Sequence, residues 1–337
     1  MKILLFNTNL AAKYVLSEIE RGDNIIILTD QKSIKMLIER LNYKNVELHY
    51  MQSDGFSLFN LIQLYKARKK IRALFEQNNI EELVYFHQAF GGFFNWIITY
   101  AHGLGIRISY QRVMRQLNSL PFKGISAWKC KLKYKLFFST DVNPIASGTH
   151  YPTPSLSQKF IRKNNIIERN GKIDNNAILS VEKKLFNIIN LPIKGHVILL
   201  LTGSVLSTGQ VEYIEYKEKM TALIQSLGTT RIICKCHPRF TDEIQIEKSL
   251  PHIPSYIPME LLENFFSIYI GYGSSVLIDV ARQNKLSISL IDYFECTSPA
   301  RHRILHQYFA HENVKFAKNI KDISLTINNY VREVAIN

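Results

Sequence analysis

The residues best suited to chemistry form a short cluster in the second half of the chain. The segment RIICKCHPRF (residues 231–240) ends an apolar, strand-like run with Lys235, His237, Pro238 and Arg239. Ligands of open α/β sheets bind at the carboxyl ends of such strands. A histidine there can donate a proton or a hydrogen bond to a phosphate, and the proline restricts the turn that aims its ring. The alternative interpretation is that His237 only ends the strand and Arg239 is a solvated charge.

A second group lies further along, in the segment IYIGYGSSVLIDVARQNKLSISLIDYFE (residues 268–295). The pattern predicts a strand, a glycine-flanked turn, a helix and another strand, with Gly273, Ser274 and Ser275 where the helix begins. Unsatisfied N–H groups at a helix amino terminus can hold a phosphate, and serine hydroxyls add donors. Serine is also a good N-cap residue, so the pair can be explained without a ligand.

Between these groups, Glu260 follows Pro258 in the segment IPMELLEN (residues 257–264). A carboxylate at the end of a βα connection can accept hydrogen bonds from ribose hydroxyls. A glutamate in the first turn of a helix is also favoured by the helix dipole. The three features occur in order within one α/β half, which favours a shared function over three separate structural explanations.

Alternating strands and helices must position these residues. In the first half, helical patterns separate strand-like runs at Ile3–Phe6, Asn24–Leu28, Val46–Tyr50 and residues 83–87 and 106–110. In the second half, a helix at about 211–227 lies among strand-like runs at 196–203, 231–236 and 267–273. This rhythm is typical of parallel sheets with helical crossovers.

Residues 119–166 do not follow this rhythm, because prolines punctuate short strand-like pieces. Within them, lysines alternate with apolar residues from Lys129 to Lys135, which predicts a strand with its charges on one face. A helix is expected near 176–190. Two successive α/β halves joined in this way predict the GT-B fold, with two Rossmann-like domains whose parallel sheets face a central cleft.

The order of the motifs KCHPR (235–239), PMELL (258–262) and GYGSSVLID (271–279) resembles the HP and S(S/T) motifs of bacterial sialyltransferases. The lipooligosaccharide sialyltransferases and polysialyltransferases are the most similar groups, and the resemblance covers about residues 194–335. In those families the HP histidine assists the departure of CMP, and the serine pair contacts the CMP phosphate. The resemblance gives these roles to His237, Ser274 and Ser275. With these groups to stabilise the phosphate charge we expect no metal or other cofactor, and the sequence has no DxD-like pair at a strand end that would suggest a bound divalent cation.

The same pattern is also similar to that of teichoic-acid glycerophosphotransferases, in which an aspartate, here Asp279, follows the serine pair within one helix turn. Both families use cytidine nucleotides, so a CDP-polyol phosphotransferase is an alternative. Many of the sialyltransferases also carry an acidic-acidic-Gly motif whose carboxylate is the general base. The nearest approximation in this chain, Ser53-Asp54-Gly55, lacks the first acid. A third alternative is therefore a non-catalytic nucleotide- or glycan-binding protein on a degenerate GT-B scaffold.

Sugar transfer with inversion needs a group that accepts the proton of the attacking hydroxyl. Glu212 and Glu215 follow the first strand of the second half, where Gly203 would let the backbone approach the donor closely. Glu215 precedes Lys219 by one helical turn, so a solvated helix face explains it equally well. His87 ends a strand of the first half and is a further candidate.

These observations predict an inverting glycosyltransferase that moves sialic acid, or a related nonulosonic acid, from a CMP-activated donor to a cell-surface glycan of lipooligosaccharide or capsule. We assign residues 1–165 to an acceptor-side domain, 166–193 to a linker and helix, and 194–337 to a nucleotide-donor domain. The expected donor-binding residues are Gly203, Lys235, Pro238, Arg239, Glu260, Gly273, Ser274 and Ser275.

The composition favours anionic partners. The chain of 337 residues has 42 Lys and Arg against 28 Asp and Glu, a net charge of +14. The first apolar run of the sequence is too short for the apolar region of a signal peptide. The spacing of the cysteines suggests neither a zinc site nor disulfides.

We expect a protein of the bacterial cytoplasm, with an oligosaccharide or glycolipid acceptor and no nucleic-acid partner. The basic run Lys66, Arg68, Lys69, Lys70 and Arg72 is either a solvated helix face or a patch that rests on the inner face of an anionic membrane. The sequence does not fix the oligomeric state.

Overall fold

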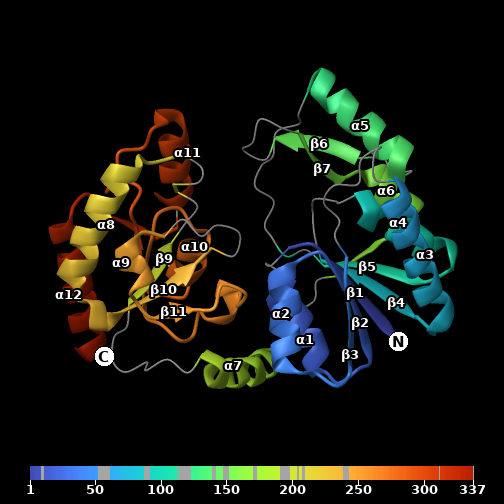
Figure 1. The fold of residues 1–337 in the computed structure, drawn as a ribbon, viewed down its shortest axis with the longest axis horizontal. Coiled ribbons are helices and arrows are strands. Elements are labelled where there is room, and N and C mark those ends of the chain that lie inside the picture. Colours follow the sequence, from blue (N-terminus) through green and yellow to red (C-terminus); the bar gives the residue numbers. More distant parts are fainter. Residues whose placement is uncertain are drawn as a thin grey trace. The chain divides into compact units, whose positions relative to one another are not determined.

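The computed structural model describes residues 1–8, 11–51, 61–86, 92–111, 113, 123–138, 142–146, 152–169, 173–189, 198–202, 205–206, 209–237, 243–310 and 312–336. The chain divides into two compact units, Met1–Val181 and Glu182–Asn337. Each unit has a parallel sheet and a hydrophobic core of its own (Figure 1). None of the helices in these ranges is long and apolar enough to cross a membrane.

The first unit is built on a parallel sheet that has six strands within the described ranges. In spatial order they are β3 (Val46–Tyr50), β2 (Ile25–Thr29), β1 (Lys2–Phe6), β4 (Glu82–Tyr85), β5 (Arg107–Gln111) and β8 (Ile167–Arg169). All residues of β2 and β4 are buried, as expected for parallel strands with both faces covered. The connecting helices are α1 (Ala12–Glu20), α2 (Lys32–Leu41), α3 (Leu61–Gln77) and α4 (Gly92–Gly103).

Helices cover both faces of this first sheet. Apolar residues of α3 and α4, among them Ile71 and Ile97, share one core cluster with alternate strand residues such as Ile3 and Leu5. Helices α1 and α2 connect β1 to β2 and β2 to β3, so the chain moves toward one edge of the sheet. Helices α3 and α4 connect β3 to β4 and β4 to β5, so the chain moves in the opposite direction. Because βαβ crossovers are right-handed, α1 and α2 lie on the other face (Figure 1).

A small antiparallel hairpin, β6 (Val142–Ala146) and β7 (Pro152–Leu156), follows the fifth strand and contacts helix α5 (Ile125–Phe138). The strand predicted from Lys129 to Lys135 is therefore wrong, because these residues lie within α5. A helix turns about 100° per residue, so lysines spaced by two fall alternately on two flanks of it. Ala127, Cys130 and Tyr134 form the helical face that packs inward. Helices α6 (Gln158–Lys163) and α7 (Asn175–Ile189) complete the region, and the range 166–193 contains β8 and α7.

The second unit repeats the topology of the first. In the described ranges its parallel strands run in the order β11 (His252–Ile253), β10 (Ile232–Cys236), β9 (Ile198–Thr202), β12 (Ile268–Gly271), β13 (Leu286–Ser289) and β14 (Lys315–Phe316). The α-helices are α8 (Tyr213–Leu227), α9 (Gln245–Lys248), α10 (Val276–Ala281), α11 (Pro299–Ala310) and α12 (Ile320–Ile336), with short 3-10 helices η3 (Thr229–Arg231) and η4 (Met259–Leu261).

In chain order, both sheets have the arrangement 3-2-1-4-5-6, which defines the Rossmann fold. The predicted α/β class with two Rossmann-like units, as in GT-B enzymes, is confirmed. In the second sheet the chain moves outward from β9 to β10 and β11, and then returns to add β12 on the opposite side of β9. The strand order therefore reverses between β9 and β12.

Candidate functional site

The candidate site lies where the strand order of the second sheet reverses. Thr202 at the end of β9 pairs with Cys236 of β10, and Leu201 pairs with Gly271 at the end of β12. His237 directly follows β10, and the turn with the serine pair directly follows β12. With strands about 4.8 Å apart, the ends of β10 and β12 are separated by roughly 10 Å. The fold thus brings His237 and the serine turn to the carboxyl edge at which ligands of such sheets bind.

Strand β13 fixes the backbone of the serine turn. The Ser289 hydroxyl donates to the Tyr272 carbonyl at 2.8 Å, and the Leu290 N–H donates to the Gly271 carbonyl at 2.8 Å. Gly271 itself packs against β9, because a Cβ atom at this position would lie 2.9 Å from the Leu201 Cβ. The turn therefore has its position set by both neighbouring strands.

The serine pair lies where the sequence predicts it, at the start of helix α10. Ser275 is the N-cap residue and is exposed, and Ser274 is half-buried. The Ser275 side chain makes no cap hydrogen bond, so helix capping does not explain its hydroxyl. Asp279, to which the phosphotransferase resemblance gives a role, lies on α10, and its Oδ1 atom is 4.0 Å from Nη1 of Arg282, the C-cap residue of this helix.

Lys235 is buried, with 5% of its surface exposed, and it holds the main chain around the end of β10. Its Nζ donates to the Cys236 carbonyl at 2.7 Å and to the Ser255 carbonyl at 3.4 Å. Burial lowers its pKa to about 8, while the Cys236 thiol and the nearby Glu260 carboxylate act in the opposite direction. The side chain thus links β10 to the segment that leads into η4, where Glu260 lies half-buried.

The pKa values of both cysteines of β10 are raised. Burial raises the pKa of Cys236 to about 12, and the Glu243 side chain adds to this shift. Burial also raises the pKa of Cys234, which is completely buried. Both thiols are therefore protonated at neutral pH and are poor nucleophiles.

We expect Lys235 to impose a pH dependence on stability. The folded chain releases this proton at about pH 8, whereas the ordinary value is 10.5, so between these values the unfolded chain binds more protons. Below this window the buried ammonium lowers the free energy of unfolding by its full cost. As the pH rises through the window this cost disappears, so the free energy of unfolding increases by at most about 1.4 kcal/mol per pH unit.

Urea unfolding of the native protein and the Lys235→Met variant across this window measures the effect. The native protein should gain stability relative to the variant as the pH rises. Cys234 and Cys236, whose raised pKa values act in the opposite sense, are present in both proteins and cancel in the difference. A difference that does not change with pH would show that the Lys235 ammonium is not buried at a cost.

The two glutamates predicted as bases have different surroundings. One carboxylate oxygen of Glu215 accepts from the Lys219 Nζ at 2.8 Å and from the Glu295 N–H at 2.7 Å, so it ties α8 to the segment after β13. Glu212 is the N-cap residue of α8, and its exposed side chain makes no cap hydrogen bond. Glu215 thus has a structural role, and among the described residues no such role is seen for the Glu212 carboxylate.

Other predicted residues lie outside the described ranges. These are His87 and Gly203, together with Pro238 and Arg239 of the HP segment. The Ser53-Asp54-Gly55 triplet also lies outside them. Their roles stay predictions.

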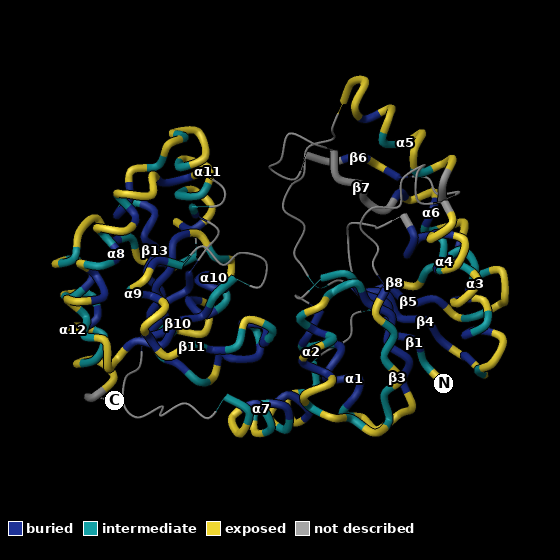
Figure 2. Tube along the Cα trace, viewed as in Figure 1, coloured by how far each residue is buried: buried dark blue, intermediate teal, exposed yellow. Residues whose placement is uncertain are grey.

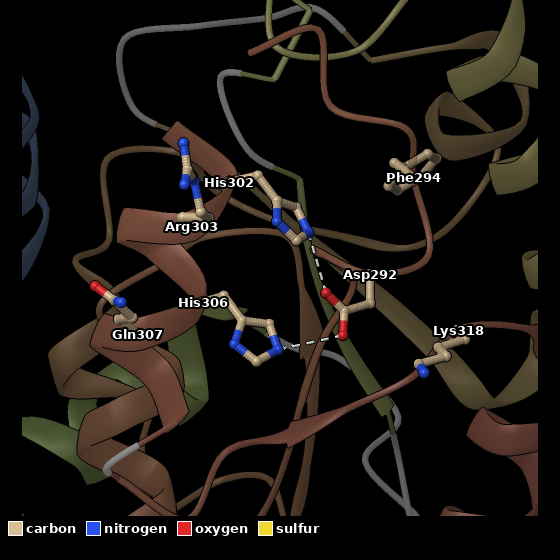
Figure 3. A pocket seen from close by; sticks show the side chains of 7 residues that line it. All are labelled: Asp292, Phe294, His302, Arg303, His306, Gln307 and Lys318. Carbon is tan, nitrogen blue, oxygen red and sulfur yellow. Dashed lines mark hydrogen bonds and ion pairs between the residues drawn. The ribbon is translucent and has the colours of Figure 1, made fainter. Parts of the chain in front are cut away.

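A pocket of about 590 Å³ opens beside α11 in the second unit, and the sequence did not point to it. Two histidines of α11 converge there on one carboxylate, with His302 Nε2 at 3.1 Å from Asp292 Oδ1 and His306 Nε2 at 3.3 Å from Asp292 Oδ2 (Figure 3). Arg303 and Lys318 also line the pocket. The spacing of the histidines, four residues apart on one helix, is the signal that could have indicated it.

Helix α11 lies close to the serine turn. A Cβ atom at Gly273 would be 3.8 Å from the Cδ1 atom of Leu305 on α11. Arg301, also on α11, acts electrostatically on the Tyr272 hydroxyl. Within the described ranges, no three histidine, cysteine or acidic side chains are arranged to hold a metal ion.

Comparison with known proteins finds likeness in structure only. No protein-family model and no curated protein matches the chain. The UDP-GlcNAc 2-epimerase of Methanocaldococcus jannaschii is 15% identical with a TM-score of 0.45, over 97% of this chain and 92% of that one. The UDP-GlcNAc 2-epimerase of Neisseria meningitidis is 11% identical with a TM-score of 0.47, over 98% and 92%. The kitacinnamycin glycotransferase is 9% identical with a TM-score of 0.45, over 95% and 86%. Likeness at this level says nothing about the donor or the reaction of this chain.

Proposed function

We propose that this protein is an inverting glycosyltransferase that moves sialic acid, or a related nonulosonic acid, from a CMP-activated donor to a cell-surface glycan. The observation that carries the proposal is that His237 and the Ser274-Ser275 turn lie at the same carboxyl edge of the second sheet, after strands β10 and β12 on either side of β9. Residues far apart in the sequence, with motifs that resemble those of cytidine-dependent transferases, thus share one ligand-binding edge.

In the proposed reaction, the acceptor hydroxyl attacks the anomeric carbon of the donor sugar. The bond between that carbon and the CMP phosphate oxygen breaks, and CMP leaves with the bonding electron pair. His237 donates a proton or a hydrogen bond to the phosphate as its negative charge grows, and the serine hydroxyls donate hydrogen bonds to it. In this scheme the protein's own groups stabilise the charge and no metal is required.

The acceptor proton must pass to a base, for which Glu212, Glu215 and His87 are the candidates. The Lys219 ammonium and the Glu295 N–H bind one carboxylate oxygen of Glu215 and hold this side chain in the link between α8 and the segment after β13. A carboxylate fixed in this way is less free to approach an acceptor hydroxyl than an exposed one. We therefore place Glu212 first among the two glutamates.

The surroundings of the serine turn support an anionic donor. Arg301 and Arg303 lie on α11, which packs beside Gly273. A CMP-linked nonulosonic acid carries one charge on its phosphate and one on its carboxylate, and basic side chains attract both. The same basic side chains would attract the phosphates of a CDP-polyol donor. Mass analysis of the product is therefore needed to distinguish transfer of a sugar from transfer of a polyol phosphate.

The donor assignment is tested by thermal unfolding with nucleotides. We expect CMP or CDP to raise the melting temperature more than UDP or GDP, because the two motifs resemble those of cytidine-dependent enzymes. A nucleotide at 100 times its Kd stabilises the folded state by about 2.7 kcal/mol.

The Ser274→Ala/Ser275→Ala variant is the matched control and should lose most of the stabilisation by CMP. Equal shifts with all four nucleotides would overturn the assignment to cytidine. Activity is then measured as release of CMP from CMP-sialic acid, above donor hydrolysis, with a panel of galactosides. Binding of CMP without such release would favour the non-catalytic alternative.

A further inference from the structure

Helix α5 of the first unit exposes a stripe of large apolar side chains. Ile125 is 75% exposed, Trp128 62%, Leu132 38% and Leu136 68%. Their spacing of three, four and four residues places them on one side of the helix. Four exposed apolar side chains in a continuous stripe differ from the isolated ones that are normal on protein surfaces.

The opposite side of α5 is fixed by packing. Ala127 is buried, and Tyr134 packs against the core cluster of the first unit. The helix contacts α4 and the β6–β7 hairpin through this side. The stripe therefore points away from the first unit, and most of α5 is exposed along its length (Figure 2).

Lysines flank the stripe on both sides. At about 100° per residue, Lys129 and Lys133 fall on one flank, and Lys131 and Lys135 fall on the other. All four are exposed, and α5 contains no acidic residue. An apolar stripe between two basic flanks is the pattern of helices that lie in the interface of an anionic membrane.

The basic run of α3, which the sequence suggested for membrane contact, is built differently. The guanidinium of Arg68 lies 5.1 Å from the ring centre of Trp96, and that of Arg72 lies 5.9 Å from the ring centre of Tyr100. Both rings belong to α4, so two of the five charges in this run are held against the first unit itself. Helix α5 instead combines exposed lysines with exposed apolar area.

We propose that α5 binds the surface of an anionic phospholipid bilayer. The apolar stripe enters the boundary between headgroups and acyl chains, and the lysines extend toward the lipid phosphates. A second copy of the chain is a poorer occupant, because its lysines would face like charges across the contact. This proposal goes beyond the glycosyltransferase assignment and does not depend on it.

The test is sedimentation of the full-length protein with lipid vesicles. We expect binding to phosphatidylcholine vesicles that contain phosphatidylglycerol to be at least about tenfold tighter than binding to pure phosphatidylcholine vesicles. Added salt should weaken this binding. Trp128 is one of two tryptophans, so its emission should shift to shorter wavelength on binding, and the Trp128→Phe variant should lose this shift.

Two double variants separate α5 from general charge. Trp128→Ser/Leu132→Ser and Lys129→Gln/Lys133→Gln should each weaken vesicle binding at least about tenfold. The matched controls lie in the second unit: Leu325→Ser on α12 and Lys217→Gln/Lys321→Gln should leave binding unchanged. Circular dichroism verifies folding of each variant, whose substituted side chains are all exposed.

Equal binding to neutral and anionic vesicles overturns the proposal. So does unchanged binding of folded α5 variants, or loss of binding only on replacement of Lys66 and Lys69 in α3. If Trp128→Ser/Leu132→Ser instead dissociates a dimer in the absence of lipid, the stripe is a contact between copies and the membrane proposal is wrong.

Discussion

Replacement of His237 with alanine is expected to lower kcat by about 10²- to 10⁴-fold, with a much smaller effect on donor binding. The proton or hydrogen bond of this histidine is most needed as the phosphate charge develops in the transition state. Steady-state kinetics with CMP-sialic acid, together with the Kd of CMP for the variant, measure the two effects separately.

The Ser275→Ala variant is the matched control. A serine that mainly holds the ground-state phosphate should raise the donor KM with a smaller effect on turnover. Because its side chain makes no cap hydrogen bond, the free energy of unfolding should stay within about 0.5 kcal/mol of the native value. A fall of about 1 kcal/mol would instead indicate a helix cap.

The kinetics of His237→Ala also decide between the catalytic and the structural interpretation. A kcat within about threefold of the native value, combined with lower stability, would mean that His237 only ends strand β10. The search for the catalytic group would then move to His87.

Replacement of Gly271 is expected to destabilise the second unit. A Cβ atom there would approach the Leu201 Cβ to 2.9 Å, between two paired central strands that cannot easily separate. Overpacking of this kind costs about 1–3 kcal/mol. Urea unfolding of Gly271→Ala should show this loss, and Gly271→Val should lose more.

Gly273, two residues further on, supplies the control. A Cβ atom at Gly273 would meet Leu305 at an ordinary 3.8 Å, so Gly273→Ala should change stability by less than about 0.5 kcal/mol. If this variant binds CMP more weakly while its stability is retained, the glycine serves the ligand. Equal destabilisation by Gly271→Ala and Gly273→Ala would contradict the packing argument.

The sequence alone was sufficient for the order of the main elements. Apolar runs such as those of β2 and β9 are buried, and parallel strands with both faces covered can be recognised in the sequence as nearly continuous apolar runs. The turn after β12 could also be located, because glycine and serine mark the end of a strand and the start of a helix. The position of this turn against β9 and β13 could not be predicted, because it depends on the order of the strands in the sheet.

Helix α5 shows where a local pattern is insufficient. Alternating lysines from Lys129 to Lys135 fit a strand as well as a helix with two basic flanks. What decides between them is the packing of Ala127 and Tyr134 against the first unit, a tertiary contact that the alternation does not encode. The same contact turns the apolar stripe outward.

At the candidate site, the sequence by itself determined which residue types follow the strands. The tertiary structure decided which of their side chains are buried and which groups they bind. Lys235 has the type of a phosphate ligand, yet its ammonium is buried and bound to main-chain carbonyls. Glu215 has the type of a base, yet Lys219 and the Glu295 N–H occupy it. Asp292 meets His302 and His306 only because β13 and α11 fold together. Hydrogen-bond partners and burial arise from segments distant in sequence, so residue type and spacing cannot specify them.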